Sequence, residues 1–190
     1  MSARALLGQR EYQRVLDEMP APAESDPEAA TLLALRATAQ LGLRHKEEAR
    51  KTLQGALQSA TDNVDVHLAL AQLALSDGDV DKAAQELDQA LRIDPKHLDS
   101  LLLKADLLRA TRKSPEAVAL YREAVQVAPL QIDARLALAG IAIADNKLDE
   151  ARKEVDAALK VAPGNLRARY TQALIDFREK KTRDPSCSTK

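Results

Sequence analysis

Three histidines and one cysteine are the side chains of this sequence best suited to bind a metal or attack a substrate. His45, His67 and His97 are not spaced four residues apart, which is the spacing that two zinc-binding histidines need on one helix. Cys187 is the only cysteine, so the sequence can form neither an internal disulfide nor a thiolate zinc site. We therefore expect no metal site, and we expect Cys187 to be an exposed, inert thiol in a polar tail.

Two acidic clusters could in principle bind a cation. The clusters are Asp77, Asp79 and Asp81, and Asp145, Asp149 and Glu150. The segment DGDVDKAAQELD lacks the ligand spacing and the closing glutamate of a calcium loop, so helix capping explains these carboxylates better. The phosphate-binding and nucleophile motifs GxGxxG, GxxxxGK[ST], HExxH and GxSxG are also missing. The sequence therefore predicts a protein that is not an enzyme and that needs no cofactor.

The composition excludes further classes of partner. The 190 residues carry a net charge of -1, and only 2% of them are aromatic. This chain offers neither the basic surface nor the stacking rings of a nucleic-acid binder. Its first residues lack the apolar core of a signal peptide, and no window could span a membrane. We expect no direct membrane insertion, with the cytoplasm as the default compartment and the cell envelope if the chain is a fragment of an envelope protein.

A repeat of 34 residues organises the sequence. Pro95, Pro129 and Pro163 follow one another at this step. Three alanine columns keep the same step: Ala37, Ala71, Ala105, Ala139 and Ala173; Ala49, Ala83, Ala117 and Ala151; Ala56, Ala90, Ala124 and Ala158. Within each period, Ala and Leu recur at the three- and four-residue spacing of an amphipathic helix. Each repeat is therefore expected to be a pair of helices.

Turn and cap residues place the expected helices. Their ranges are 9–19, 27–41, 45–59, 63–76, 79–92, 97–110, 114–126, 131–144, 147–160 and 165–180. Gly78 is expected in a left-handed conformation before Asp79 caps the next helix, and Asn146 is expected to replace Gly78 in a later repeat. Ser114 is expected to cap the helix that Pro115 begins.

This pattern of small residues resembles the tetratricopeptide repeat family, whose repeat is a helix-turn-helix of 34 residues. The resemblance implies an all-α fold, a right-handed superhelical α-solenoid of antiparallel helix pairs with about four repeats and a C-terminal capping helix. It places a partial N-terminal repeat at 1–26 and the array at 27–180. The repeats are expected at about 30–63, 64–97, 98–131 and 132–165, with the capping helix at 166–180 and a disordered tail at 181–190.

The sequence departs from the family where large rings usually pack. The tryptophan column of the family reads Leu33, His67, Leu101, Arg135 and Arg169 here. The Ala- and Leu-rich repeats are also similar to those of bacterial envelope proteins, in particular the long tetratricopeptide lipoproteins of exosortase (PEP-CTERM) systems. The first twenty residues resemble the second helix of a repeat with a remnant of its first.

Family resemblance also implies where a partner binds, because the first helix of each repeat lines a concave groove. The residues carried over to this groove are Leu68, Gln72, Asp99, Leu102, Asp106, Arg109, Asp133, Leu136, Tyr170, Leu174 and Phe177. Leu68, Leu102, Leu136 and Tyr170 form a ladder at the 34-residue step, and an exposed apolar strip usually marks an interaction surface. The competing interpretation is that neighbouring helices cover the ladder.

The sequence thus predicts a non-catalytic scaffold for protein–protein interaction. Its expected partner is a protein or peptide segment with apolar side chains and a basic flank. The alternative is an accessory repeat region of a larger enzyme, or of an exopolysaccharide- or protein-export assembly in the bacterial envelope. Self-association through an exposed first or last helix is a third hypothesis.

Overall fold

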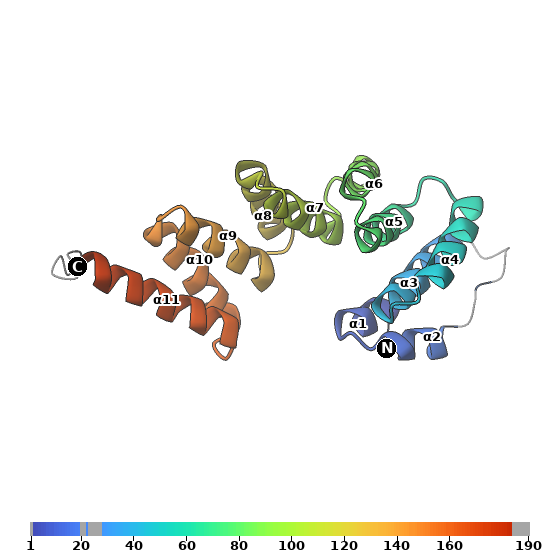
Figure 1. Cartoon of the computed structure of the whole chain (residues 1–190). Helices are drawn as coiled ribbons and strands as arrows, with labels where there is room; N and C mark the ends of the chain where they lie inside the picture. The colour runs from blue at the N-terminus through green and yellow to red at the C-terminus, as the bar shows by residue number, and fades with distance from the viewer. Residues whose placement is uncertain (1, 20–21, 23–27, 184–190) are drawn as a thin grey trace. The chain divides into compact units, whose positions relative to one another are not determined.

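The computed structural model describes residues 2–19, 22 and 28–183, and this part of the chain contains eleven helices and no strand (Figure 1). The helices are α1 (Ala3–Gly8), α2 (Tyr12–Glu18), α3 (Ala29–Gly42), α4 (Lys46–Ser59), α5 (Val64–Asp77), α6 (Val80–Ile93), α7 (Leu98–Ala110), α8 (Ser114–Val127), α9 (Ile132–Ala144), α10 (Leu148–Val161) and α11 (Leu166–Arg183). The predicted all-α solenoid of helix pairs is confirmed. The helices belong to two compact units, residues 1–100 and 101–190.

One left-handed residue joins the two helices of every pair. These residues are Arg10, Arg44, Gly78, Arg112 and Asn146, and they follow one another at the 34-residue step. In each turn the left-handed residue donates its N–H to the carbonyl three residues back, and the next N–H reaches five residues back. For Gly78 and Asp79 these bonds measure 3.1 and 2.9 Å. This Schellman arrangement satisfies carbonyls that the end of the first helix leaves free.

The cap expected at Asp79 is present, and two asparagines cap other helices. The side chain of Asp79 accepts from the N–H of Lys82, and Asn63 and Asn165 cap α5 and α11 in the same way. The cap expected at Ser114 is wrong, because α8 already includes Ser114 and its N-cap is Lys113, which makes no side-chain cap bond. Pro115 still occupies the first turn, where its missing N–H costs nothing.

The expectation of one N-terminal helix at 9–19 is also wrong. Two helices, α1 and α2, occupy residues 3–18, and left-handed Arg10 separates them. Leu6 of α1 and Val15 of α2 pack with Ala39 of α3 in a small cluster. The predicted partial repeat therefore contains a helix pair, although its status as a repeat stays a prediction. The tail expected at 181–190 lies, after Arg183, outside the described residues, and so does Cys187.

The alanine columns form the core of each unit. In the first unit, Ala37, Ala49 and Ala56 are fully buried against Leu53 between α3 and α4. In the second unit, Ala139, Ala151 and Ala158 are fully buried beside Val155, and the core extends to Ala168 and Ile175 of α11. Side chains this small let neighbouring helices approach closely, so the helices within each unit bury their apolar faces on one another.

Candidate interaction surface

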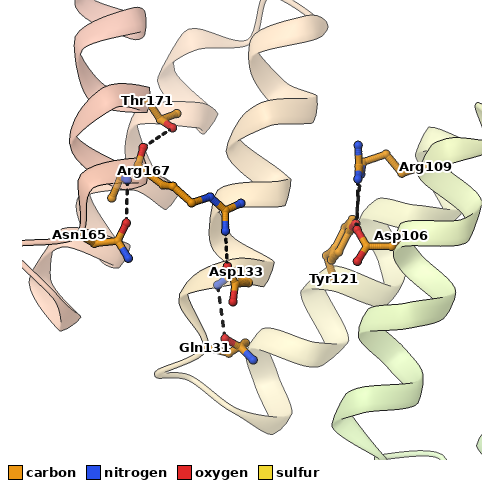
Figure 2. A network of polar contacts seen from close by, with 9 residues as sticks. Asp106, Arg109, Tyr121, Gln131, Asp133, Asn165, Arg167 and Thr171 are labelled. Carbon is orange, nitrogen blue, oxygen red and sulfur yellow. Dashed lines mark hydrogen bonds and ion pairs between the residues drawn. The ribbon is translucent and has the colours of Figure 1, made fainter. Parts of the chain in front are cut away.

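Two long-range contacts hold α9 and α11 side by side in the second unit. At the beginning of both helices, Nη1 of Arg167 lies 2.6 Å from Oδ1 of Asp133 (Figure 2). At the other end of α9, Nη1 of Arg178 donates to the carbonyl oxygen of Ile143 at 2.8 Å. The helices thus run in the same direction, as first helices of successive repeats must. We define the α9–α11 surface as Asp133, Leu136 and Gly140 of α9 with Arg167, Tyr170 and Leu174 of α11.

The floor of this surface is apolar and closed. Leu136 is 7% exposed and packs in one cluster with Ala139 and Ile143, and Leu174 packs on the same cluster. Tyr170 of α11 is 72% exposed. A ligand on this surface would therefore meet the exposed ring of Tyr170 and the half-buried side chain of Leu174.

Gly140 opens the middle of the surface. It lies inside α9, is exposed, and a Cβ atom added to it would meet no other atom within 4 Å. Packing therefore does not require glycine here, and glycine inside a helix costs about 0.5–1 kcal/mol relative to alanine. Asp133, Leu136 and Gly140 share one face of α9 through their three- and four-residue spacing. The missing side chain lets another backbone approach this face closely.

The Asp133–Arg167 pair forms the polar edge of the surface. The two side chains are 67% and 71% exposed, so water screens their attraction and the pair contributes at most about 1 kcal/mol. A charged ligand can exchange with either partner at little cost. Because Asp133 already holds a guanidinium, a basic flank on a ligand would have to compete with Arg167.

Asp106 and Arg109 of α7, two of the expected groove residues, are instead tied to a buried tyrosine. The hydroxyl of Tyr121 donates to Oδ1 of Asp106 at 2.5 Å, and Nε of Arg109 donates to the same hydroxyl at 3.3 Å (Figure 2). Tyr121 is 1% exposed. Burial raises the pKa of this tyrosine to about 12, and the hydrogen bond to Asp106 acts in the same direction. Both charged residues thus help to hold the core.

The first unit covers the corresponding positions with its own chain. Leu68 is 8% exposed, and Nη2 of Arg4 in α1 lies 2.8 Å from Oδ2 of Asp65, which is also 8% exposed. Nε2 of His97 lies 3.9 Å from the other oxygen of Asp65. The amide oxygen of Gln72 is buried without a hydrogen-bond partner in the described structure. The carboxylate of Asp65 is therefore already paired with Arg4 of the same unit.

The remaining expected residues differ in exposure. Leu102 is half-buried, Asp99 is exposed, and Phe177 is 66% exposed. Of the apolar ladder, Leu68 and Leu136 are covered and only Tyr170 is well exposed. Sequence reasoning passed over Arg4 and Arg178, because nothing local signals a partner 61 or 35 residues away.

No group of three or more metal-binding side chains occurs among the residues that the structure describes. In the same part of the chain, none of the helices is both long enough and apolar enough to cross a membrane. The three histidines instead lie beside carboxylates: His45 beside Glu48, His67 beside Glu86, and His97 beside Asp65.

Comparison with known families agrees with this geometry. A tetratricopeptide repeat model matches residues 44–107 and 108–175, which is more than half of the chain. The chain belongs to the tetratricopeptide repeat family. The turn column and the alanine columns are thus the packing framework of tetratricopeptide repeats, and α9 and α11 both stand at the first-helix position of the 34-residue register.

Solved tetratricopeptide structures share the fold at low sequence identity. A thermophilic tetratricopeptide protein of Thermus thermophilus matches with a TM-score of 0.69 and 22% identity, over 91% of this chain and 93% of its own. PilF of Pseudomonas aeruginosa matches with a TM-score of 0.69 and 16% identity, over 95% and 88%. YrrB, described as a tetratricopeptide protein with an unusual peptide-binding site, matches with a TM-score of 0.62 and 18% identity, over 90% and 88%.

No curated protein sequence matches the chain. The narrower resemblance to exosortase-system lipoproteins therefore stays a prediction, and so do the envelope alternative and the compartment.

Proposed function

We propose that this tetratricopeptide protein is a non-catalytic scaffold that binds a peptide segment on the α9–α11 surface. The observation that carries the proposal is Gly140, an exposed glycine inside a helix with open space where its side chain would be. The α9–α11 surface combines this gap with an apolar floor and one exposed ring, which together suit an extended segment with apolar side chains. The peptide-binding site described for YrrB supports the same class of function.

The chemistry of the surface narrows the ligand. Leu174 and Tyr170 offer apolar contact to a ligand side chain, whereas Asp133 and Arg167 offer one charge of each sign at the edge. We therefore propose a peptide with one or two apolar anchors, whose backbone crosses α9 at Gly140. A basic flank would pair with Asp133 by displacing Arg167.

Adding a large side chain at Gly140 tests this proposal. Peptides selected from a random display library on the 190-residue chain are measured against Gly140→Trp and Gly55→Trp. Gly55 is the matched control because it also lies inside a helix, on α4, with no atom within 4 Å of an added Cβ. We expect Gly140→Trp to weaken binding at least about tenfold, since it removes the close backbone approach, and Gly55→Trp to leave it unchanged.

Equal binding by both variants would contradict the proposal. Leu136→Asp is unsuitable for this purpose, because Leu136 belongs to the buried cluster and a charge there would disrupt the unit. Circular dichroism of both tryptophan variants checks that they are folded.

A further inference from the structure

The last helix is apolar on two opposite faces. Ala168 and Ile175 are fully buried and attach α11 to the second unit. On the other side, Leu166, Tyr170 and Phe177 are 80%, 72% and 66% exposed, and Ala173 between them is exposed as well. We call Leu166, Tyr170, Ala173 and Phe177 the outer stripe. Their spacings of four, three and four residues put them on one line along the helix, as in a coiled-coil seam.

Preceding repeats show what such a stripe normally contacts. Ala105 and Ala139 occupy the position of Ala173 two repeats and one repeat earlier, and both are fully buried. Leu136 and Ile143, one repeat before Tyr170 and Phe177, are 7% and 6% exposed. The stripe is thus built to lie under a neighbouring helix, and the described residues supply none for α11. A free apolar face of this length marks an interaction surface.

We propose that the outer stripe binds the outer stripe of a second copy of this chain, with the two α11 helices antiparallel. A two-fold axis between Thr171 and Gln172 puts Tyr170 opposite Ala173 of the second copy, and Leu166 opposite Phe177. Each layer then joins a large side chain to a smaller one. A parallel pair would instead stack Tyr170 on Tyr170 and leave a gap at the alanine layer.

The charges beside the stripe favour the same arrangement. Arg169 and Asp176 flank the stripe on one side, and antiparallel pairing brings Arg169 of each copy to Asp176 of the other. Arg169 is exposed, and its side chain makes no hydrogen bond or ion pair within the described structure. Asp176 is 51% exposed and, although it binds Arg152 at 2.6 Å, its carboxylate can accept a second donor. One helix pair buries less than a standard protein interface, so the dimer is weak and its population depends on concentration.

Substitution of Ala173 distinguishes this specific pairing from non-specific hydrophobic association. Sedimentation velocity over a wide concentration range should show a reversible monomer–dimer equilibrium for the wild type. Ala173→Leu adds apolar surface, yet it places Leu against Tyr170 of the second copy, so we expect at least about tenfold weaker dimerisation. The swapped variant Tyr170→Ala/Ala173→Tyr restores large against small, and it should dimerise within about threefold of the wild type.

Two further variants complete the test. Arg169→Asp should weaken dimerisation, and adding Asp176→Lys should restore it, because the pair is then reversed. Leu130→Ser is the matched control, since Leu130 is 74% exposed but lies outside α11, and it should change nothing. A wild type that stays monomeric at all concentrations overturns the proposal, as does Ala173→Leu dimerising as well as or better than the wild type. Ala173→Leu and Arg169→Asp leave every residue of the α9–α11 surface unchanged. Tyr170 belongs to both surfaces, so the peptide proposal is judged by Gly140→Trp and not by the swapped variant.

Discussion

Arg135 and Glu154 form the same cross-helix pair as His67 and Glu86, two repeats earlier. Nη1 of Arg135 lies 3.1 Å from Oε2 of Glu154, and its guanidinium also donates to the carbonyl of Pro129. Nδ1 of His67 lies 2.8 Å from Oε2 of Glu86, and Nε2 lies 3.1 Å from the carbonyl oxygen of Thr61. In these two repeats, His67 and Arg135 thus stand where the family has tryptophan, and each pairs with a glutamate of the second helix.

Alternate repeats support this account. In the other two repeats, the position equivalent to Arg135 is Leu33 or Leu101. The position equivalent to Glu154 is Thr52 or Leu120. Glutamate occurs where the first column is His67 or Arg135, and not where it is leucine. Over residues 33–135 the column therefore holds either a side chain paired with glutamate or a leucine.

Removing Arg135 alone from its pair with Glu154 should lower the unfolding free energy more than replacing both residues with leucine. Arg135→Leu leaves Glu154, 25% exposed, and the Pro129 carbonyl without their donor, so we expect a loss of about 1–3 kcal/mol in unfolding free energy. Arg135→Leu/Glu154→Leu copies Leu101 and Leu120 and should recover most of that loss. Urea unfolding measures both, and a double variant no more stable than the single one would contradict the interpretation.

Two helical glycines should respond oppositely to alanine. A Cβ on Gly42 would lie 2.6 Å from the ring of Tyr12, so Gly42→Ala should displace Tyr12 and loosen α2 from α3 by about 1–3 kcal/mol. Gly140→Ala meets nothing and should stabilise α9 by up to about 1 kcal/mol. Hydrogen exchange of the α2 and α9 amides measures each effect locally. Equal shifts in both helices would argue against the steric cause.

Tyr121 should lose its proton at a higher pH than an ordinary tyrosine. Its folded pKa of about 12 lies above the value of about 10 in unfolded chains. The proton is therefore held more tightly in the folded state, so this stabilisation is present below about pH 10 and is lost as the pH rises towards about 12. The tyrosinate absorbance of Tyr12→Phe/Tyr170→Phe should have its midpoint near pH 12. In Tyr121→Phe, this part of the pH dependence of stability should be absent.

Asp77 should contribute to stability only above acidic pH. The hydrogen bond from Arg50, at 2.9 Å, lowers the pKa of Asp77, and Lys46 adds to the effect. Since the folded state binds this proton less tightly, the stabilisation is present above the ordinary aspartate pKa of about 4 and disappears as the pH falls through the lowered value. Asp77→Asn should unfold more easily than the wild type near pH 7, whereas the two should converge near pH 2. A difference that persists in acid would contradict this assignment.

The repeat register and most helix ends could be predicted because their signals are local. Asn63, Asp79 and Asn165 cap helices through backbone groups three residues away, which the sequence displays directly. The break at Arg10 was missed because arginine, unlike glycine, carries no preference for a left-handed turn.

Exposure of the predicted site could not be predicted, because it depends on what lies above each residue. Leu68, Leu136 and Tyr170 occupy equivalent positions, yet they are 8%, 7% and 72% exposed. The first two are covered, and the third belongs to the last described helix. Burial of Asp65 likewise depends on Arg4, which comes from a helix 61 residues earlier.

The left-handed residues between the helices of each pair are positions where substitution can change the order in which the repeats unfold. Repeat arrays unfold by breaking contacts between neighbours, so a small change in one repeat can decide where unfolding begins. Arg44 and Arg112 each hold a conformation that costs a non-glycine residue about 1 kcal/mol, and Gly78 avoids that cost. Glycine placed at Arg44 or Arg112 would strengthen a chosen turn without touching the core. Glycine at Arg44 or Arg112, both of which are exposed, should therefore change which repeat unfolds first.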